Sequence, residues 1–379
     1  MRHKRKLTFF SVLPPFRGGI AQFSEELRKS LDDKAIVQAF TFKQQYPDFL
    51  FPGQSQFDKE KADFEFPRVV STFRPWTYFR ALKRFKRSNP EIFLTNYWMS
   101  FFGPMMGFWA RFLPKKTVKI ALVHNLIPHE KRFFDQAFNR YFVHSYDGFI
   151  LLSESVEQEV KQLRPDARTC VLKHPSYHQY GQRLDAKQSK SKLGLSLDKK
   201  TILFFGLIRS YKGLDLLLEA FSMLDDTYQL VIAGEIYGDR SIYDALISTS
   251  KNKQIVFHDY FISNDALPNY FSAADLCVLP YRSATQSGIK ATCDAFSLPV
   301  LVSRVGGLSE EITAGENGFV MNAMTAESLA KQLEEITSST ALKQVSEYLQ
   351  FQQESSKKEW EIFADAVLDF SRQIEQSKN

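Results

Sequence analysis

The chain has 379 residues, which is long for one domain and short for three, so its length favours two domains. Hydrophobic residues make up 44% and charged residues 24%, a balance that excludes a largely disordered chain and is typical of a soluble globular protein. The 35 phenylalanines indicate bulky cores first of all. Three widely spaced cysteines without a CxxC motif predict neither a disulfide framework nor a zinc site, and they fit a reducing cytoplasm.

The net charge of +6 is divided unevenly along the chain. Residues 1–190 contain 32 Lys and Arg against 18 Asp and Glu, whereas residues 191–379 contain 17 against 25. The basic half is therefore expected to face an anionic partner or surface. Its densest part is either a solvated helix face or a contact with an anionic membrane leaflet, and it consists of Arg80, Lys83, Arg84, Lys86 and Arg87.

Two segments resemble membrane signals. Leu7–Leu13 follows a basic start as in a signal peptide, but it is short and ends at Pro14 without a small-residue cleavage site, so we expect a buried first strand. Ile92–Ala110 lacks charged residues over about the length of a bilayer span but contains glycine and proline. We expect a strand, Ile92–Thr95, that continues into a buried helix, with membrane insertion as the alternative.

Both halves alternate short apolar runs with amphipathic stretches, the pattern of a parallel sheet covered by helices. The sequence thus predicts an α/β fold with two tandem doubly wound Rossmann-like domains facing a cleft. We place the domains at 1–180 and 181–355, followed by a helix at 356–379 that can pack back on the first domain. Gln182–Leu197 is expected to be the linker region and Ser338–Lys358 to be loosely ordered.

The expected elements follow from this alternation. Strands are expected at Leu7–Leu13, Ile92–Thr95, Val118–Val123, Gly148–Leu152, Thr201–Phe205, Gln229–Ala233, Ile255–His258, Leu276–Leu279 and Val300–Val302. Helices are expected at Ile20–Leu31, Leu214–Leu224, near Ala266–Ser272 and from Ser287. Because parallel sheets bind ligands at the carboxyl ends of their strands, site residues should directly follow strands.

A segment with glycines and cations directly follows the strand expected at Thr201–Phe205. It contains Gly206, Arg209, Lys212 and Gly213. Glycine lets a ligand approach the backbone, and a guanidinium beside an ammonium complements a diphosphate. The spacing fits neither a Walker loop nor the GxGxxG fingerprint. From these residues alone, a basic turn without a ligand is an equally good interpretation.

The order of motifs from about Thr201 to Phe319 resembles the C-terminal domain of family 4, or group 1, glycosyltransferases, which have the GT-B fold. The first half is similar more weakly, through Pro14–Ile20 and Val123–Glu130. The motifs of the second half are Phe-Gly-x-x-Arg-x-x-Lys-Gly-x-Asp from Phe205, Val231–Glu235, Leu267–Asp275, Leu298–Val300 and Gly306–Glu310.

The resemblance implies a retaining transfer of a sugar from a nucleotide-diphosphate donor, with no metal and no cofactor. Arg209 and Lys212 would stabilise the charge that develops on the leaving diphosphate. Gly18 and Gly19 would present backbone N–H groups and a helix N-terminus to the same phosphates, although a glycine pair is also an ordinary tight turn.

His124 directly follows an expected strand, and the resemblance implies a contact between it and the donor sugar, with Asn125 beside it. A satisfied core histidine is the alternative for His124. His129 and Glu130 would assist, or would form a charge pair at the start of a helix.

The chain departs from the family pattern between Pro280 and Pro299. Many members have two glutamates eight residues apart, at the positions occupied here by Ala284 and Thr292. We expect neutral hydrogen bonds to replace them, from Gln286, Ser287 and the Gly288 backbone.

Asp294 bears on this departure, and Leu207 marks a second one. Asp294 lies two residues beyond the second glutamate position and is a poor substitute, because a helix turns it to another face. Leu207 stands where the family commonly has arginine, and Arg209 projects from the same face of an extended backbone.

The leading hypothesis is a metal-independent transferase that moves a sugar to a glycan or lipid-linked acceptor, in cell-surface polysaccharide or glycolipid synthesis. Its N-terminal domain would bind the acceptor. The basic first half and the aromatic stretch Trp98–Phe112 suggest a cytoplasmic protein that is peripheral on the inner face of an anionic membrane, and no nucleic-acid partner is expected. The alternatives are a non-catalytic binding or activating subunit and a sugar-nucleotide epimerase.

Overall fold

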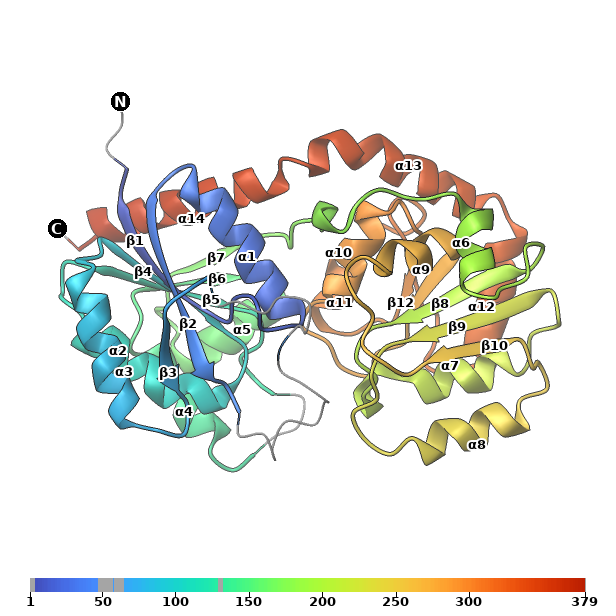
Figure 1. The fold of residues 1–379 in the computed structure, drawn as a ribbon, viewed down its shortest axis with the longest axis horizontal. Helices are drawn as coiled ribbons and strands as arrows, with labels where there is room; N and C mark the ends of the chain where they lie inside the picture. Colours follow the sequence, from blue (N-terminus) through green and yellow to red (C-terminus); the bar gives the residue numbers. More distant parts are fainter. Residues whose placement is uncertain (1–3, 47–56, 58–64, 129–131, 379) are drawn as a thin grey trace. The chain divides into compact units, whose positions relative to one another are not determined.

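The computed structural model describes residues 4–46, 57, 65–128 and 132–378. The chain forms two compact units (Figure 1): unit 1 is Met1–Lys173 with Glu359–Asn379, and unit 2 is His174–Lys358. The sequence had suggested boundaries at 180/181 and 355/356. The segment after Lys173 belongs to unit 2 because Tyr177 donates its backbone N–H to the carbonyl of Ala291, at 3.4 Å.

Unit 1 is built on a seven-stranded sheet in which all paired strands are parallel, in the order β3-β2-β1-β4-β5-β6-β7. Every residue of the central strands β4 and β5 is buried, as expected where helices cover both faces of a parallel sheet. The strands are β1 Lys6–Phe10, β2 Ile36–Gln44, β3 Arg68–Ser71, β4 Ile92–Tyr97, β5 Val118–Val123, β6 Gly148–Leu151 and β7 Thr169–Val171.

The last helix of the chain, α14 (Glu359–Gln376), packs beside α1 in unit 1 (Figure 1). Arg5, just before β1, holds it with a 2.8 Å hydrogen bond to Ser371 and a 2.9 Å ion pair with Glu375. The other helices of unit 1 are α1 Gly19–Asp32, α2 Trp76–Arg87, the 3-10 helix η2 Ser100–Phe102, α3 Gly103–Phe112, α4 Asp135–Val143 and α5 Glu154–Leu163.

The core of unit 1 is strongly aromatic. The Phe10 ring lies 4.8 Å from both the Phe42 and Trp109 rings and 5.9 Å from the Phe85 ring, so β1, β2, α2 and α3 meet around it. Tilted and edge-on ring pairs of this kind add to the stability gained from burial. The many phenylalanines are therefore used largely as core residues.

The segment Ile92–Ala110 forms β4, η2 and most of α3, with Met105, Met106 and Trp109 buried. Among the described residues, no helix is long and apolar enough to cross a membrane.

Unit 2 repeats the same topology with six strands, in the order β10-β9-β8-β11-β12-β13, and its paired strands are also parallel. In both sheets the first strand of the unit lies in the middle, between its second and fourth strands. The doubly wound α/β class is thus confirmed. The strands are β8 Lys200–Phe205, β9 Tyr228–Ala233, β10 Ile255–His258, β11 Leu276–Leu279, β12 Val300–Val302 and β13 Phe319–Val320.

The helices of unit 2 begin with local caps at several positions. The side chains of Asp185, Ser287 and Thr325 accept hydrogen bonds from backbone N–H groups at the starts of α6, α10 and α12. The helices are η3 His178–Tyr180, α6 Ala186–Lys192, η4 Ser210–Lys212, α7 Leu214–Phe221, α8 Ser241–Thr249, α9 Leu267–Ala273, α10 Gly288–Ala295, α11 Gly306–Glu310, α12 Ala326–Ser338 and α13 Ala341–Ser356.

Two expectations about polar segments are wrong. Gln182–Leu197 is no linker, because α6 lies within it and Lys190, which is 7% exposed, pairs with Asp275 at 3.4 Å. Ser338–Lys358 contains the 16-residue helix α13. Its apolar residues Val345 and Leu349 are four positions apart and buried, which is sufficient for one face of a helix to pack.

Candidate functional site

The strand order of unit 2 identifies where a ligand can bind. β8 and β11 are neighbours, and the connections that leave them run to opposite sides of the sheet, which is the topological switch point of a doubly wound fold. The segments that follow these strands are 206–213 and 280–287. The cations and polar side chains predicted from the sequence lie on these two segments.

The two segments are held together as one unit. Gly213 has φ +69°, and a Cβ there would overlap the carbonyl oxygen of Pro280, so the backbones approach too closely for any other residue. Arg282 donates its backbone N–H to the carbonyl of Tyr211 at 2.7 Å and forms a two-point ion pair with Asp215, at 2.6 and 2.9 Å. The position of Lys212 is therefore fixed from both sides.

Lys212 is a cation without a nearby counter-charge. Its ammonium lies 5.3 Å from the centroid of the Tyr281 ring, and among the described residues no carboxylate forms an ion pair with it. Burial, reinforced by the positive charge of Arg209, lowers the pKa of Lys212 to about 8. A charge kept in a desolvated place costs stability, so this arrangement suits a site that receives an anion.

Arg209 begins the short helix η4 with an extended backbone, and its guanidinium lies 6.0 Å from the Tyr211 ring. The residue before it, Ile208, is fully buried and donates its N–H to the carbonyl of Glu235. Leu207 is 39% exposed and Arg209 is half-buried, so both side chains lie on the outer side of this segment.

The start of α10 adjoins the same place. A Cβ at Gly206 would lie 3.3 Å from Ile289 and 3.5 Å from the Lys212 ammonium, so Gly206 separates the cation from the first turn of the helix. Ser287 caps this helix, and the Oε1 atom of Gln286 is buried without a hydrogen-bond partner among the described residues. The Gln286 amide oxygen thus directly precedes the N-terminus of α10, and Gly206 lies between that helix and the Lys212 ammonium.

Neutral residues, Ala284 and Thr292, occupy the two positions at which many family members have glutamates. Ala284 is 8% exposed, and Thr292 turns its hydroxyl back onto the carbonyl of Gly288 at 2.8 Å, within α10. No carboxylate therefore extends from either position.

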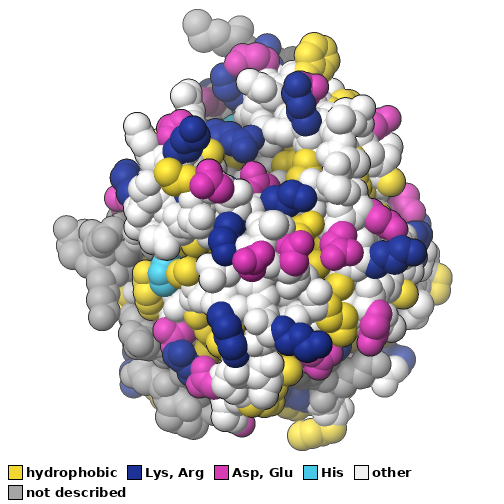
Figure 2. All heavy atoms as spheres, turned by 90° about the vertical axis from the view of Figure 1, so that its right-hand side faces the viewer, with side chains coloured by type: hydrophobic (Ala, Val, Ile, Leu, Met, Phe, Trp, Pro, Cys, Tyr) yellow, Lys and Arg dark blue, Asp and Glu magenta, His cyan; other side chains and the backbone are white. Residues whose placement is uncertain are grey.

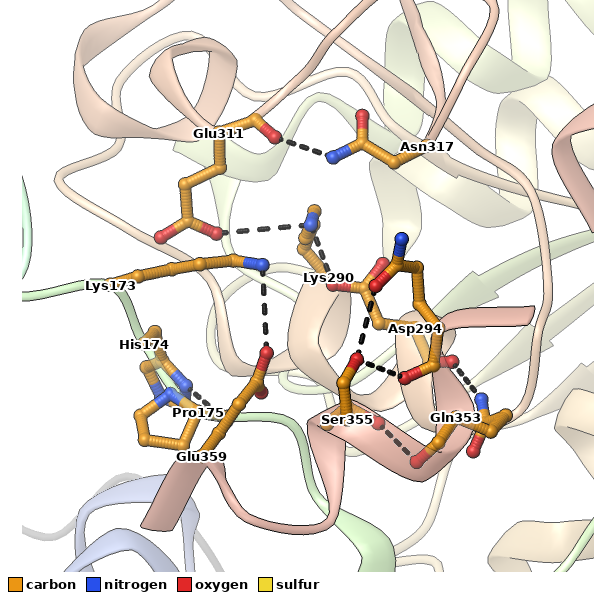
Figure 3. Close-up of polar contacts among 12 residues, drawn as sticks. Lys173, His174, Pro175, Lys290, Asp294, Glu311, Asn317, Gln353, Ser355 and Glu359 are labelled. Carbon is orange, nitrogen blue, oxygen red and sulfur yellow. Dashed lines mark hydrogen bonds and ion pairs between the residues drawn. The ribbon is translucent and has the colours of Figure 1, made fainter. Parts of the chain in front are cut away.

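Asp294 serves a structural contact instead (Figure 3). Its carboxylate pairs with Lys290 at 2.6 Å, and Lys290 also lies 4.0 Å from Glu311. Burial alone would lower the pKa of Lys290, but Asp294 and Glu311 together raise it. Because Lys290 is 2% exposed, the group ties α10 to the end of α11 and leaves Asp294 engaged within unit 2.

Tyr281 was not singled out from the sequence. It is 3% exposed, its ring lies beside the Lys212 ammonium, and its hydroxyl meets no partner with hydrogen-bond geometry among the described residues. Burial raises the pKa of Tyr281, which keeps the phenol neutral. Its place two residues after the end of a strand, β11, was the available signal.

Gly18 and Gly19 lie at the start of α1 in unit 1. Gly18 is the N-cap residue with φ +106°, a conformation that favours glycine, and Gly19 is the first residue of the helix. A Cβ at either position would meet no atom of the described residues within 4 Å.

His124 directly follows β5, where its N–H binds the carbonyl of Tyr97 at 2.8 Å. It is 2% exposed, and its ring lies edge-on to Phe23 of α1 at 4.8 Å. The Oδ1 atom of the neighbouring Asn125 is buried without a hydrogen-bond partner among the described residues. His129 and Glu130 lie outside the described residues.

Within the described part of the chain, no group of three His, Cys, Asp or Glu residues is placed to hold a metal ion. The three cysteines are free: Cys277 and Cys293 are buried, and Cys170 is half-buried.

Comparison with known proteins gives a family match for the C-terminal part of the chain. Residues 185–353 match the family described as "Glycosyl transferases group 1". The C-terminal unit belongs to the group 1 glycosyl transferases. Over 153 residues the chain is 30% identical to a D-inositol 3-phosphate glycosyltransferase of Arthrobacter sp. strain FB24. This alignment covers 39% of this chain and 36% of that protein. The chain thus spans about a third of the length of this curated relative.

Solved structures align over nearly the whole chain, and they show that its fold is GT-B. Sucrose-phosphate synthase of Thermosynechococcus elongatus aligns with a TM-score of 0.76 and 17% identity over 98% of this chain and 100% of that one. HepE of Anabaena, in complex with UDP, aligns with a TM-score of 0.73 and 14% identity over 98% and 99% of the two chains. At these identities the structures bear on the fold alone.

Proposed function

We propose that the chain transfers a sugar from a nucleoside-diphosphate donor to a glycan or lipid-linked acceptor, with retention of the anomeric configuration. The observation that carries this proposal is Lys212: a desolvated cation without a carboxylate partner among the described residues, at the switch point of unit 2. Cations fixed before the reaction stabilise a leaving diphosphate without reorganisation in the transition state. The Anabaena relative of the same fold, solved with UDP-glucose, supports a donor of this class.

The donor site would divide its tasks among the residues of unit 2. Lys212 and Arg209 would bind the diphosphate together with the first N–H groups of α10, so the charge is neutralised by protein groups and the reaction requires neither metal nor cofactor. Gly206 would let the phosphates approach, and the Gln286 amide would bind the donor by neutral hydrogen bonds.

Unit 1 would supply the remaining contacts. Gly18 and Gly19 would present N–H groups from the start of α1, and His124 with Asn125 would contact the donor sugar. Because His124 packs against Phe23, its proposed role needs a separate test. We expect His124→Ala to lower turnover while the affinity for the free nucleotide stays unchanged; equal losses in both would point to a structural role.

A panel of UDP, GDP, ADP and their sugars, added during thermal unfolding, tests the proposal. A ligand at 100 times its dissociation constant stabilises the native state by about 2.7 kcal/mol, which is readily seen as a shift in melting temperature. We expect one base to give this shift and Lys212→Ala to abolish it, while Lys331→Ala, at a lysine that is 79% exposed, leaves it intact. NMR of the first product formed would then report whether the anomer of the donor is retained.

A non-catalytic subunit is the second candidate, because Ala284 and Thr292 bring no carboxylate to the site. Nucleotide binding without turnover of any donor would favour it over the transferase. A sugar-nucleotide epimerase would instead convert the donor without an acceptor. We also propose that the enzyme works at the cytoplasmic face of a membrane, in the synthesis of a cell-surface polysaccharide or glycolipid.

A further inference from the structure

Aromatic side chains are exposed on one side of unit 1. Phe79 is 63% exposed, Trp76 57%, Phe112 56% and Phe73 41%, whereas most large apolar side chains of the unit are buried. The sequence had pointed to the stretch Trp98–Phe112, but Phe102 and Trp109 within it are core residues, and Phe112 is its exposed large side chain. These four exposed aromatic residues come from α2, the turn before it and the end of α3, whereas Phe133, which is 98% exposed, precedes α4.

Three of these rings pair with neighbouring aromatic rings, and one series of contacts joins α2 to α3. The rings of Phe79 in α2 and Phe108 in α3 lie 5.0 Å apart, and those of Phe108 and Phe112 lie 4.8 Å apart. Phe73 stacks on Phe101 at 5.2 Å. Contiguous exposed aromatic area is unusual on a soluble monomer and marks a binding surface.

Basic side chains continue the same surface. From residue 73 to residue 116 the chain has nine Lys and Arg but a single acidic residue, Glu91. Glu91 is engaged elsewhere, since it accepts the N–H of Lys6 at 2.9 Å at the start of β1. The exposed basic residues of this face are Arg74, Arg80, Lys83, Arg84, Lys86 and Arg87, and none of them is in an ion pair with a described carboxylate.

A hollow of about 300 Å³ adjoins Trp76 at the carboxyl ends of β2 and β3. Four cations line it, and among the described residues no carboxylate does. One of the four, Arg68, is held by backbone carbonyls of β2, while Arg74 and Arg80 are exposed. The lining residues are Lys43, Gln44, Phe57, Arg68, Ser71, Arg74, Trp76, Thr77 and Arg80.

We infer that this face of unit 1 docks on an anionic lipid bilayer, with its aromatic rings at the headgroup level and a lipid phosphate in the basic hollow. Trp and Phe favour the membrane interface, and Lys and Arg near an anionic leaflet are attracted to it. The face of unit 2 seen in Figure 2 differs, because basic and acidic side chains are interspersed on it. Docking on the bilayer does not depend on the proposed function. Only its consequence, that a lipid-linked acceptor is presented at this face, rests on the proposed function.

Flotation of the full chain with vesicles tests the inference. We expect binding to vesicles of phosphatidylcholine with phosphatidylglycerol at low salt, weaker binding at high salt, and none to phosphatidylcholine alone. Each basic residue near the membrane surface raises the partition coefficient about fivefold. The double variant Lys83→Gln with Arg87→Gln should therefore lower it by about 25-fold. Trp76→Ser with Phe79→Ser should also weaken binding, and Arg74→Gln with Arg80→Gln tests the hollow.

Matched controls separate this face from general effects. Lys331→Gln with Lys343→Gln removes two exposed charges from unit 2, and Phe351→Ser removes an apolar side chain that is 83% exposed there. Both controls should bind vesicles like the wild type. No flotation of the wild type, equal losses in the controls, or a dimer that Trp76→Ser and Phe79→Ser dissolve would overturn the inference. Nucleotide binding without vesicles tests the proposed function independently.

Discussion

The binding of a nucleoside diphosphate should weaken as pH rises through 8. Lys212 has a pKa of about 8 because it is desolvated, so its ammonium is about nine-tenths charged at pH 7 and about one-tenth charged at pH 9. If the diphosphate binds only the charged form, the dissociation constant rises about tenfold over this range, which corresponds to about 1.4 kcal/mol. A lysine with an ordinary pKa would stay charged, and binding would barely change.

Isothermal titration calorimetry at half-unit steps from pH 7 to pH 9 measures this change. Lys212→Gln should bind weakly at every pH, because it removes the titrating group. Lys212→Arg should bind with little change between pH 7 and pH 9, since a guanidinium stays charged. The reasoning is refuted if the wild type shows no loss by pH 9, or if Lys212→Gln retains the same titration.

The same charge should lower the stability of the unliganded protein, because the folded pKa of Lys212 lies below its unfolded value of about 10.5. The loss of folding free energy is fully present below pH 8 and is relieved as pH rises toward 10.5. Lys212→Met should thus stabilise the protein at pH 7, by on the order of 2 kcal/mol, as a higher melting temperature. Asp294→Asn should lower the free energy of unfolding in urea by about 3 kcal/mol, because Lys290 loses its partner. The double variant Lys290→Met with Asp294→Leu should recover most of this loss. No loss of stability in the single variant would refute the pairing. Gly213→Ala should abolish nucleotide binding through overlap with the neighbouring loop, while Gly194→Ala, with a similar φ of +70° but open space, should bind normally in calorimetry.

Much of the sheet architecture could be predicted because parallel strands that are buried on both faces form uninterrupted apolar runs. Ile255–His258, Leu276–Leu279 and Val300–Val302 were placed at the bounds found in the structure. The strand β2 was missed because its first residues are exposed and its apolar run is interrupted by polar residues. This pattern alone does not indicate a strand, because β2 is stabilised by its pairing with the neighbouring strands.

The helix α13 was missed for a related reason. Its composition is polar, and Gln353 gains its place by hydrogen bonds to the Asp294 carbonyl and the Ser297 hydroxyl, at 2.7 and 3.1 Å. These partners are more than 50 residues away in the chain. A local pattern contains no information about them.

For the candidate site, residue type and position after a strand drew attention to Arg209 and Lys212, and the family resemblance implied their role; the helix expected from Ser287 is present as α10. The sequence could not show that Lys212 lies beside Tyr281 or that Arg282 pairs with Asp215, because both contacts join segments about 70 residues apart. It also could not show how the His124 ring packs.

The central claim is that unit 2 binds the diphosphate of a donor at Lys212. A crystal structure with the best-binding nucleoside diphosphate tests it most directly. We expect phosphate oxygens within hydrogen-bond distance of the Lys212 ammonium and of the first N–H groups of α10. A diphosphate bound elsewhere, or bound here without contact to Lys212, would contradict the account.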